Sequence, residues 1–270
     1  MRRVRSLTQW WLGLAAMCLV AGAGAQRPGG PQPGPRAGGA TVAEQYLLAA
    51  ANQERAALGL RLLERNPLLA QAAAGHAREM AARGSISHQF PGEAELSARG
   101  ASAGVRFSVI SENVAEAPST VEIHTMWMHS PGHRANLLDP AIDSAGISVI
   151  ARAGEFYAVE DFARTVESFS LEEQESAIAA LIAQPGSMAL TDGADAISAA
   201  RQTCAMSTGY AGARKPWFVM RFTSDSLAVL PDQLKVRLAS GKFHEAAVGA
   251  CAGTGKGPFT SYNIAVLLYP

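Results

Sequence analysis

Three titratable residues, far apart along the chain, have the chemistry to form one site. His133 follows Ser130 and Pro131 at the predicted start of a helix, where unpaired backbone N–H groups and the helix dipole favour a neutral imidazole. His88 lies in a predicted loop, and Glu112 lies in a short polar break of an apolar stretch. Neutral imidazoles and a carboxylate can bind zinc and leave its fourth position open, or they can move a proton.

Each of these residues also has a purely structural interpretation. His133 could make a hydrogen bond at its helix terminus, His88 could be an ordinary loop residue, and Glu112 could accept backbone N–H bonds. Titratable residues often have such roles, so residue type and spacing alone leave both interpretations open.

The remaining histidines and the helix tryptophan have simpler expected places. His76 shares a helix face with leucine, alanine and methionine, so we expect it in the core or at its boundary. We expect His124 and His129 to face outward on their helix, and Trp127 to lie in the core.

Helix and strand signals predict the elements that hold these residues. Thr41 and Glu44 form a capping box, Asn66 with Pro67 begins a second helix, and Gly84 ends it. A strand-rich stretch around Gly154 then predicts a β-hairpin. The order of several helices and then a hairpin indicates an α+β fold. The predicted helices cover 41–59, 66–84, 93–98, 119–128 and 130–138, and the hairpin strands cover 145–151 and 156–162.

Residues 44–166 resemble the bacterial branch of the CAP superfamily, also called the SCP-like or PR-1-like extracellular domain. Each motif is weak alone, but all occur in the family's order. They are Asn52-x-x-Arg55-x-x-x-Gly59-Leu60, Asn66-x-x-Leu69-x-x-x-Ala73 with Met80, Ser87-His88, Glu112-Asn113, Trp127-x-x-Ser130-Pro131-Gly132-His133-Arg134-x-Asn136-Leu137-Leu138, Gly146-Ile147 and Phe156-Tyr157 to Phe162.

The resemblance implies an α-β-α sandwich whose central cleft is lined by two histidines and two acidic residues. His88 and His133 match the histidines, and Glu112 matches the first glutamate. Ser130 stands where the second glutamate would be, so the set of four is incomplete. Asp161 could supply another carboxylate, although spacing alone does not place it.

Composition limits the class of protein. The chain has 270 residues, of which 48% are hydrophobic, and this fraction argues against wholesale disorder. Lysine plus arginine and aspartate plus glutamate both number 23. A general nucleic-acid binder normally has a basic excess, so we expect no nucleic-acid partner.

The N-terminus has the layout of a secretory signal peptide. Arg2, Arg3 and Arg5 precede an apolar stretch that runs to Ala25, where small residues offer a cleavage site. This stretch is short for a membrane span, so we prefer cleavage to an uncleaved anchor and expect no stable span afterwards. We expect a signal peptide over 1–25, a Pro/Gly-rich linker over 26–40, and a secreted or periplasmic protein.

Cleavage would leave two cysteines for the rest of the chain. Because export leads to an oxidising compartment, we expect a disulfide between Cys204 and Cys251 rather than two buried thiols. We expect the CAP-like domain over 41–167 and a smaller α+β region over 168–270, with an elaboration of the first sheet as the alternative. No internal sequence repeat stands out.

Two functions fit these observations. The resemblance favours a binding module with a His/Glu-lined cleft that could hold a metal, for a small apolar ligand, a glycan or an extracellular protein. The alternative is a metal-dependent hydrolase that uses His88, Glu112 and His133 on a metal-bound water, with a divalent ion such as zinc. H-E-x-x-H and G-x-S-x-G are absent, and no serine or cysteine is visibly paired with a base. We therefore prefer the binding module and do not expect an enzyme.

Overall fold

A computed structural model describes residues 39–270 except 185–187, 192 and 254–256. The predicted signal peptide and nearly all of the predicted linker therefore lie outside the described residues. No helix in the described part of the chain is long and apolar enough to cross a membrane. Residues 40–270 contain two separate four-stranded sheets.

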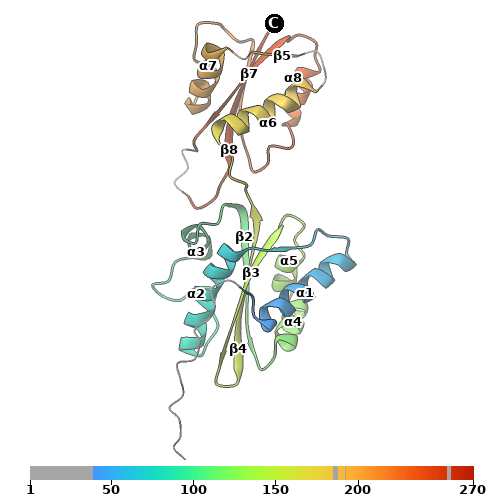
Figure 1. Cartoon of the computed structure of the whole chain (residues 1–270), viewed down its shortest axis with the longest axis vertical. Helices are drawn as coiled ribbons and strands as arrows, with labels where there is room; N and C mark the ends of the chain where they lie inside the picture. The colour runs from blue at the N-terminus through green and yellow to red at the C-terminus, as the bar shows by residue number, and fades with distance from the viewer. Residues whose placement is uncertain (1–38, 185–187, 192, 254–256) are drawn as a thin grey trace, which may run out of the picture. The chain divides into compact units, whose positions relative to one another are not determined.

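The first sheet has the strand order β1-β3-β4-β2. Its edge strand β1 pairs in parallel with β3, and the other neighbours are antiparallel. Figure 1 shows its helices and strands. They are α1 Val42–Ala57, β1 Glu64–Arg65, α2 Pro67–Arg83, α3 Leu96–Ser102, β2 Phe107–Ala117, α4 Thr120–His129, α5 Pro131–Leu137, β3 Ser144–Arg152 and β4 Glu155–Thr165.

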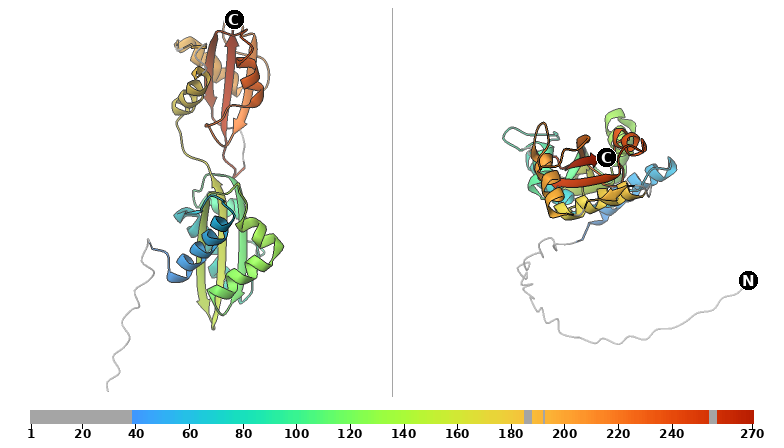
Figure 2. Two further views of the ribbon diagram at one scale, coloured as in Figure 1. Left: turned by 90° about the vertical axis from the view of Figure 1, so that its right-hand side faces the viewer. Right: turned by 90° about the horizontal axis from the view of Figure 1, so that it is seen from above.

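Helices cover both faces of this sheet. On one face α2 packs against Val114, Tyr157 and Val159. On the other face α1 and α4 bury Leu47 and Trp127 against the same strands, and α5 adds a further cluster. This is the expected α-β-α sandwich. Figure 1 shows α2 on one side of the sheet and α1 and α4 on the other, and the left view of Figure 2 shows α1 and α4 in front of the sheet.

Local sequence signals explain where most of these helices begin and end. Thr41 and Glu44 form the predicted capping box of α1. Asn66 caps α2 with Pro67 in its first turn, and Gly84 ends it in the left-handed conformation at φ +63°. The hairpin between β3 and β4 turns at two residues with positive φ, one of which is Gly154.

In this region one strand was not predicted and one helix was misplaced. The polar break around Glu112 lies inside β2, a strand of 11 residues. A strand can carry Glu112 and Asn113 there because both side chains have hydrogen-bond partners in the protein. The short helix begins at Leu96 rather than near Glu93, because the Glu93 carboxylate accepts hydrogen bonds in the preceding loop.

The second sheet has the strand order β5-β7-β8-β6. β8 is a central strand, and nearly all of its residues are buried. The elements are α6 Leu171–Ala183, β5 Ala189–Leu190, α7 Ala194–Ala205, β6 Phe218–Ser224, α8 Asp232–Leu238, β7 Glu245–Cys251 and β8 Tyr262–Tyr269. α7 packs on one face, and α6 and α8 bury the main apolar cluster on the other.

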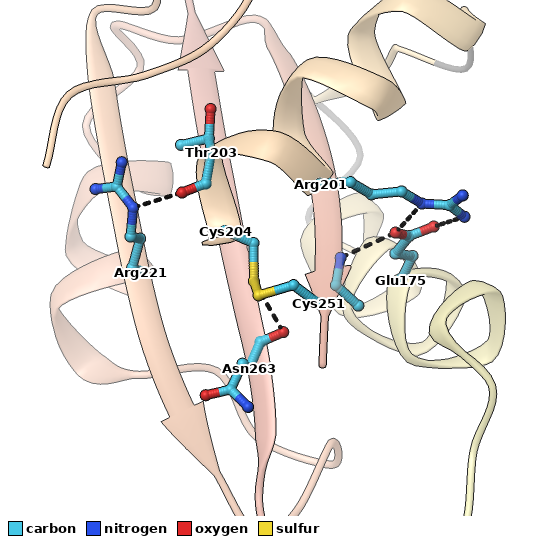
Figure 3. Close-up of a disulfide and its surroundings, with 8 residues drawn as sticks. Glu175, Arg201, Thr203, Cys204, Arg221, Cys251 and Asn263 are labelled. Atoms are coloured by element: carbon cyan, nitrogen blue, oxygen red, sulfur yellow. Dashed lines mark hydrogen bonds and ion pairs between the residues drawn. A yellow bond between two sulfur atoms is a disulfide. The ribbon is translucent and has the colours of Figure 1, made fainter. Parts of the chain in front are cut away.

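The predicted disulfide joins α7 to β7. Cys204 and Cys251 are bonded with their Cα atoms 5.8 Å apart (Figure 3). The Cys204 sulfur lies 3.3 Å from the carbonyl oxygen of Asn263 on β8. The bridge thus ties the last turn of the helix to the middle of the sheet.

Candidate functional site

Glu112 lies at the base of the candidate site, on the face of the sheet that α2 covers. Its side chain is 2% exposed. One carboxylate oxygen lies 2.9 Å from His88 Nδ1, and the other is paired with the Arg99 guanidinium. A buried carboxylate is costly unless it is paired, and these two partners supply the pairing.

His88 and His133 form the exposed side of the site. The His88 side chain is 61% exposed, and its ring centroid lies 6.3 Å from that of His133. Because Glu112 accepts a hydrogen bond from His88 Nδ1, the proton of the neutral ring is on Nδ1, and Nε2 is left as an acceptor. Burial, and then the charge of His88, lower the pKa of His133 below its ordinary value. Both causes favour the neutral form of the His133 ring.

Two asparagines hold the helix of His133 against β2. Asn113 donates from Nδ2 to the His133 carbonyl at 3.0 Å. Asn136 donates from Nδ2 to the Glu112 carbonyl and to Asn113 Oδ1, both at 3.1 Å. These bonds fix α5 relative to Glu112, so they set where the imidazole of His133 lies.

A second layer of charged groups supports Glu112 from α2, α3 and their connecting loop. His76 Nδ1 lies 2.7 Å from Glu93 Oε1, and its Nε2 lies 2.7 Å from the Ser87 carbonyl. Both partners are hydrogen-bond acceptors, so both ring nitrogens of His76 face acceptors. Its Nε2 also lies 3.9 Å from Glu112 Oε2. His76 is thus buried, as predicted, but it also belongs to the surroundings of the site.

Asp161 adds a second buried acid beside Glu112. The two residues are directly paired between β2 and β4, so their side chains share a face. Asp161 is fully buried, and its oxygens have no hydrogen-bond partner among the described residues. Burial, and then the charge of Glu112, raise the pKa of Asp161 well above its ordinary value. Both causes favour the protonated form of the Asp161 carboxyl group.

Comparison with known proteins finds a family match for the part of the chain that forms the first sheet and its helices. Residues 48–162 match the family described as CAP, the cysteine-rich secretory protein family. This segment is thus similar to a CAP domain. The match covers the first sheet and its helices, as the sequence motifs predicted.

Related proteins match the same part of the chain. YkwD of Bacillus subtilis is 28% identical over 108 residues, which are 40% of this chain and 42% of that protein. An extracellular SCP-domain protein of Bacillus anthracis is 27% identical over 46% of this chain and 40% of its own, with a TM-score of 0.43. A cysteine-rich secretory protein of Staphylococcus aureus is 24% identical over 46% of this chain and 39% of its own, with a TM-score of 0.39. The chain spans less than half the length of each of these three relatives.

The groups around Glu112 indicate whether its carboxylate can bind a metal ion. Within the described residues, no group of three or more histidine, cysteine, aspartate or glutamate side chains is placed to hold a metal ion. Both oxygens of Glu112 are already engaged, by His88 and by Arg99. A carboxylate behind an imidazole orients the ring and fixes its tautomer, so Glu112 has the geometry of a partner to His88 rather than of a ligand.

One other histidine of this region differs from expectation. His129 is exposed and Trp127 is buried, as predicted, but the His124 side chain, which was expected to face outward, is only 12% exposed. His124 Nε2 faces Glu54 on α1 at 3.7 Å, because α4 packs against that helix.

Arg99 was not predicted as a site residue. No motif around Arg99 indicates a role in the site. The sequence offered only a general signal, which is that a buried carboxylate such as Glu112 needs a cation nearby.

Proposed function

We propose that this chain is an exported binding module in which His88 and His133 contact a polar, hydroxyl-bearing ligand such as a glycan. The observation that carries the proposal is the buried Glu112 carboxylate 2.9 Å from His88 Nδ1. This hydrogen bond leaves the outer nitrogen of an exposed ring free to accept from a ligand hydroxyl. His133 adds a second neutral ring 6.3 Å away, centre to centre.

The surroundings of the two rings support hydrogen bonding over apolar burial. The exposed side of the site carries imidazole nitrogens, and the layer beneath it contains the ion pair of Arg99 with Glu112. An apolar ligand would desolvate these groups without replacing their hydrogen bonds. Of the three ligand classes that the sequence suggested, a glycan is therefore favoured over an apolar molecule or a protein.

Export is supported by three observations. The first 25 residues have the pattern of a signal peptide, the Cys204–Cys251 bridge suits an oxidising compartment, and the matching family is described as secretory. Mass spectrometry of protein from the periplasm or medium tests this, with a mature N-terminus at Gln26 as the expected result.

A glycan array tests the binding proposal. We expect the full chain to bind at pH 7.5, and His88→Gln/His133→Ala to lose that binding. His129→Ala is the matched control, because it removes an exposed histidine from α4 outside the site. Equal binding by the site variant and the control variant would refute the proposal.

A metal-dependent hydrolase is the second candidate. It draws on the same hydrogen bond, since a carboxylate that orients an imidazole also occurs at zinc centres and in acid–base catalysis. If zinc binds, His88 and His133 are the residues that offer ligands, with Glu112 behind His88. Calorimetry with zinc at pH 7.5 would show equal binding by the wild type and His88→Ala/His133→Ala if this site holds no metal. Zinc-dependent turnover of an ester or peptide library, lost in His133→Ala, would favour the hydrolase over the binding module.

A further inference from the structure

The two sheets of this chain have the same topology. In each, a first helix leads to a short edge strand, a second helix, a strand, one or more helices and a closing hairpin; the first unit has the additional helix α3 between its second helix and β2. The strand orders β1-β3-β4-β2 and β5-β7-β8-β6 correspond position by position. The edge strand is parallel to its neighbour in both sheets, and the other pairs are antiparallel (Figures 1 and 2).

The layers correspond as well. The second helix, α2 or α7, packs on one face of its sheet, where the first unit also has α3. The first helix and the helices that follow β2 or β6 lie on the other face. The first helix begins with a capping box in both cases, Thr41 with Glu44 and Ser170 with Glu173.

A glycine under the second helix fixes the alignment of the two units. A Cβ at Gly146 on β3 would lie 2.2 Å from backbone atoms at Leu69 and Ala70 of α2. A Cβ at Gly249 on β7 would lie 2.2 Å from backbone atoms at Ala200 and Arg201 of α7. Only glycine allows either helix to approach its strand so closely, and this contact is the same in both units.

This alignment shows what replaces the candidate site in the second unit. In the first sheet Gly146 pairs with Asp161, which pairs with Glu112. In the second sheet Gly249 pairs with Ala265, which pairs with Arg221. An alanine thus stands at the position of Asp161, and a guanidinium stands at the position of Glu112.

Arg221 uses its position to hold the end of α7. Its Nε donates to the Thr203 carbonyl at 2.7 Å (Figure 3). Its Nη2 donates to the Gly209 carbonyl. α7 ends at Ala205, five residues beyond Ala200. His76 lies seven residues beyond Leu69, so its counterpart falls outside the shorter helix.

The disulfide occupies a matching place. On α7, Cys204 lies four residues after Ala200, and on α2, Ala73 lies four residues after Leu69. On β7, Cys251 lies two residues after Gly249, and on β3, Ser148 lies two residues after Gly146. In the first unit, Ala73 and Ser148 are buried without a covalent bond, and α2 has 17 residues against 12 in α7.

We infer that residues 171–269 are a second copy of the fold of residues 42–165 that lacks the site, and that the disulfide replaces packing which the longer helix α2 supplies in the first copy. Among the described residues, the His/Glu site is thus present in the first copy and not at the matching positions of the second. The inference rests on topology, register and close contacts, so it holds whether or not the proposed glycan binding does.

Matched glycine substitutions in the full chain test the repeat. We expect Gly249→Ala to speed hydrogen exchange in α7 and β7 only, and Gly146→Ala to do so in α2 and β3 only. Gly193→Ala and Gly75→Ala are the controls, because a Cβ at either position meets nothing within 4 Å. If Gly249→Ala exchanges as slowly as Gly193→Ala, the helix contact is absent and the repeat is refuted.

A second variant tests the role of the bridge and does not depend on the glycines. Cys204→Ala/Cys251→Ser gives the second unit the residues found at the matching places of the first. We expect the folding equilibrium of the second unit to fall roughly a thousandfold, on the loop-entropy model. The NMR signals of His88 and His133 should keep their chemical shifts. Unchanged stability, or loss of both units in one step, would overturn the inference.

Discussion

A buried carboxyl group on β4 makes the stability of this protein depend on pH. Glu160 is fully buried, and neither of its oxygens has a hydrogen-bond partner among the described residues. Burial raises its pKa from the ordinary 4.5 to about 8. Between these two values the folded protein holds a proton that the unfolded chain has lost, so raising the pH favours unfolding. We expect this one group to lower the free energy of unfolding by about 4 kcal/mol between pH 5 and pH 9.

The substitution Glu160→Gln isolates this contribution. Glutamine has nearly the same shape and stays neutral, so the variant should lack the dependence that Glu160 causes. The raised pKa of Asp161 acts in the same direction in both proteins, so its effect cancels from the difference. The variant should therefore gain about 4 kcal/mol on the wild type between pH 5 and pH 9.

Urea denaturation at pH 5, 7 and 9 measures the difference, with Trp127 fluorescence and circular dichroism as two probes. Glu64→Gln is the control, because its side chain is 78% exposed and should leave the pH dependence unchanged. If the wild type and Glu160→Gln lose stability in parallel as the pH rises, Glu160 does not hold a proton in the folded protein, and the reasoning from burial fails.

Three further predictions follow from the ion pair, the bridge and the imidazoles. Arg99→Met should cost about 3 to 5 kcal/mol in urea denaturation at pH 7, because it leaves Glu112 buried without its cation; a cost below about 1 kcal/mol would show that the pair is solvated. Cys204→Ala/Cys251→Ser should cost about 4 kcal/mol, since the bridge spans a sequence separation of 47, and an unchanged denaturation midpoint would contradict this. An NMR titration should give His133 a pKa below 6.5 that rises in His88→Gln, where only burial still lowers it; no rise would mean that the two rings do not interact.

Much of the first fold could be predicted because its signals are local. The caps at Thr41 and Asn66 and the glycine at position 84 mark helix ends through backbone geometry, which depends on few neighbours. Strand β2 was missed because its polar residues are acceptable only when partners from distant elements reach them. His88, 24 residues from Glu112, is such a partner.

The candidate site was predicted only in part for the same reason. The family motifs named His88, Glu112 and His133, and the structure brings these residues together. Arg99 and His76 act through contacts with Glu112 that no local pattern encodes. Their places follow from how α2 and α3 pack on the sheet.

The repeat of the fold shows how little sequence a topology requires and how much a site requires. The two units share a capping box and a glycine under a helix, which suffice to begin one helix and to seat another. The site needs a helix long enough to place His76, a loop to supply His88 and α3 to supply Arg99. The substitution Arg221→Glu would therefore not create a second site. It would place a carboxylate beside the carbonyls of Thr203 and Gly209, where acceptors already face it and the described residues offer no replacement for the lost guanidinium.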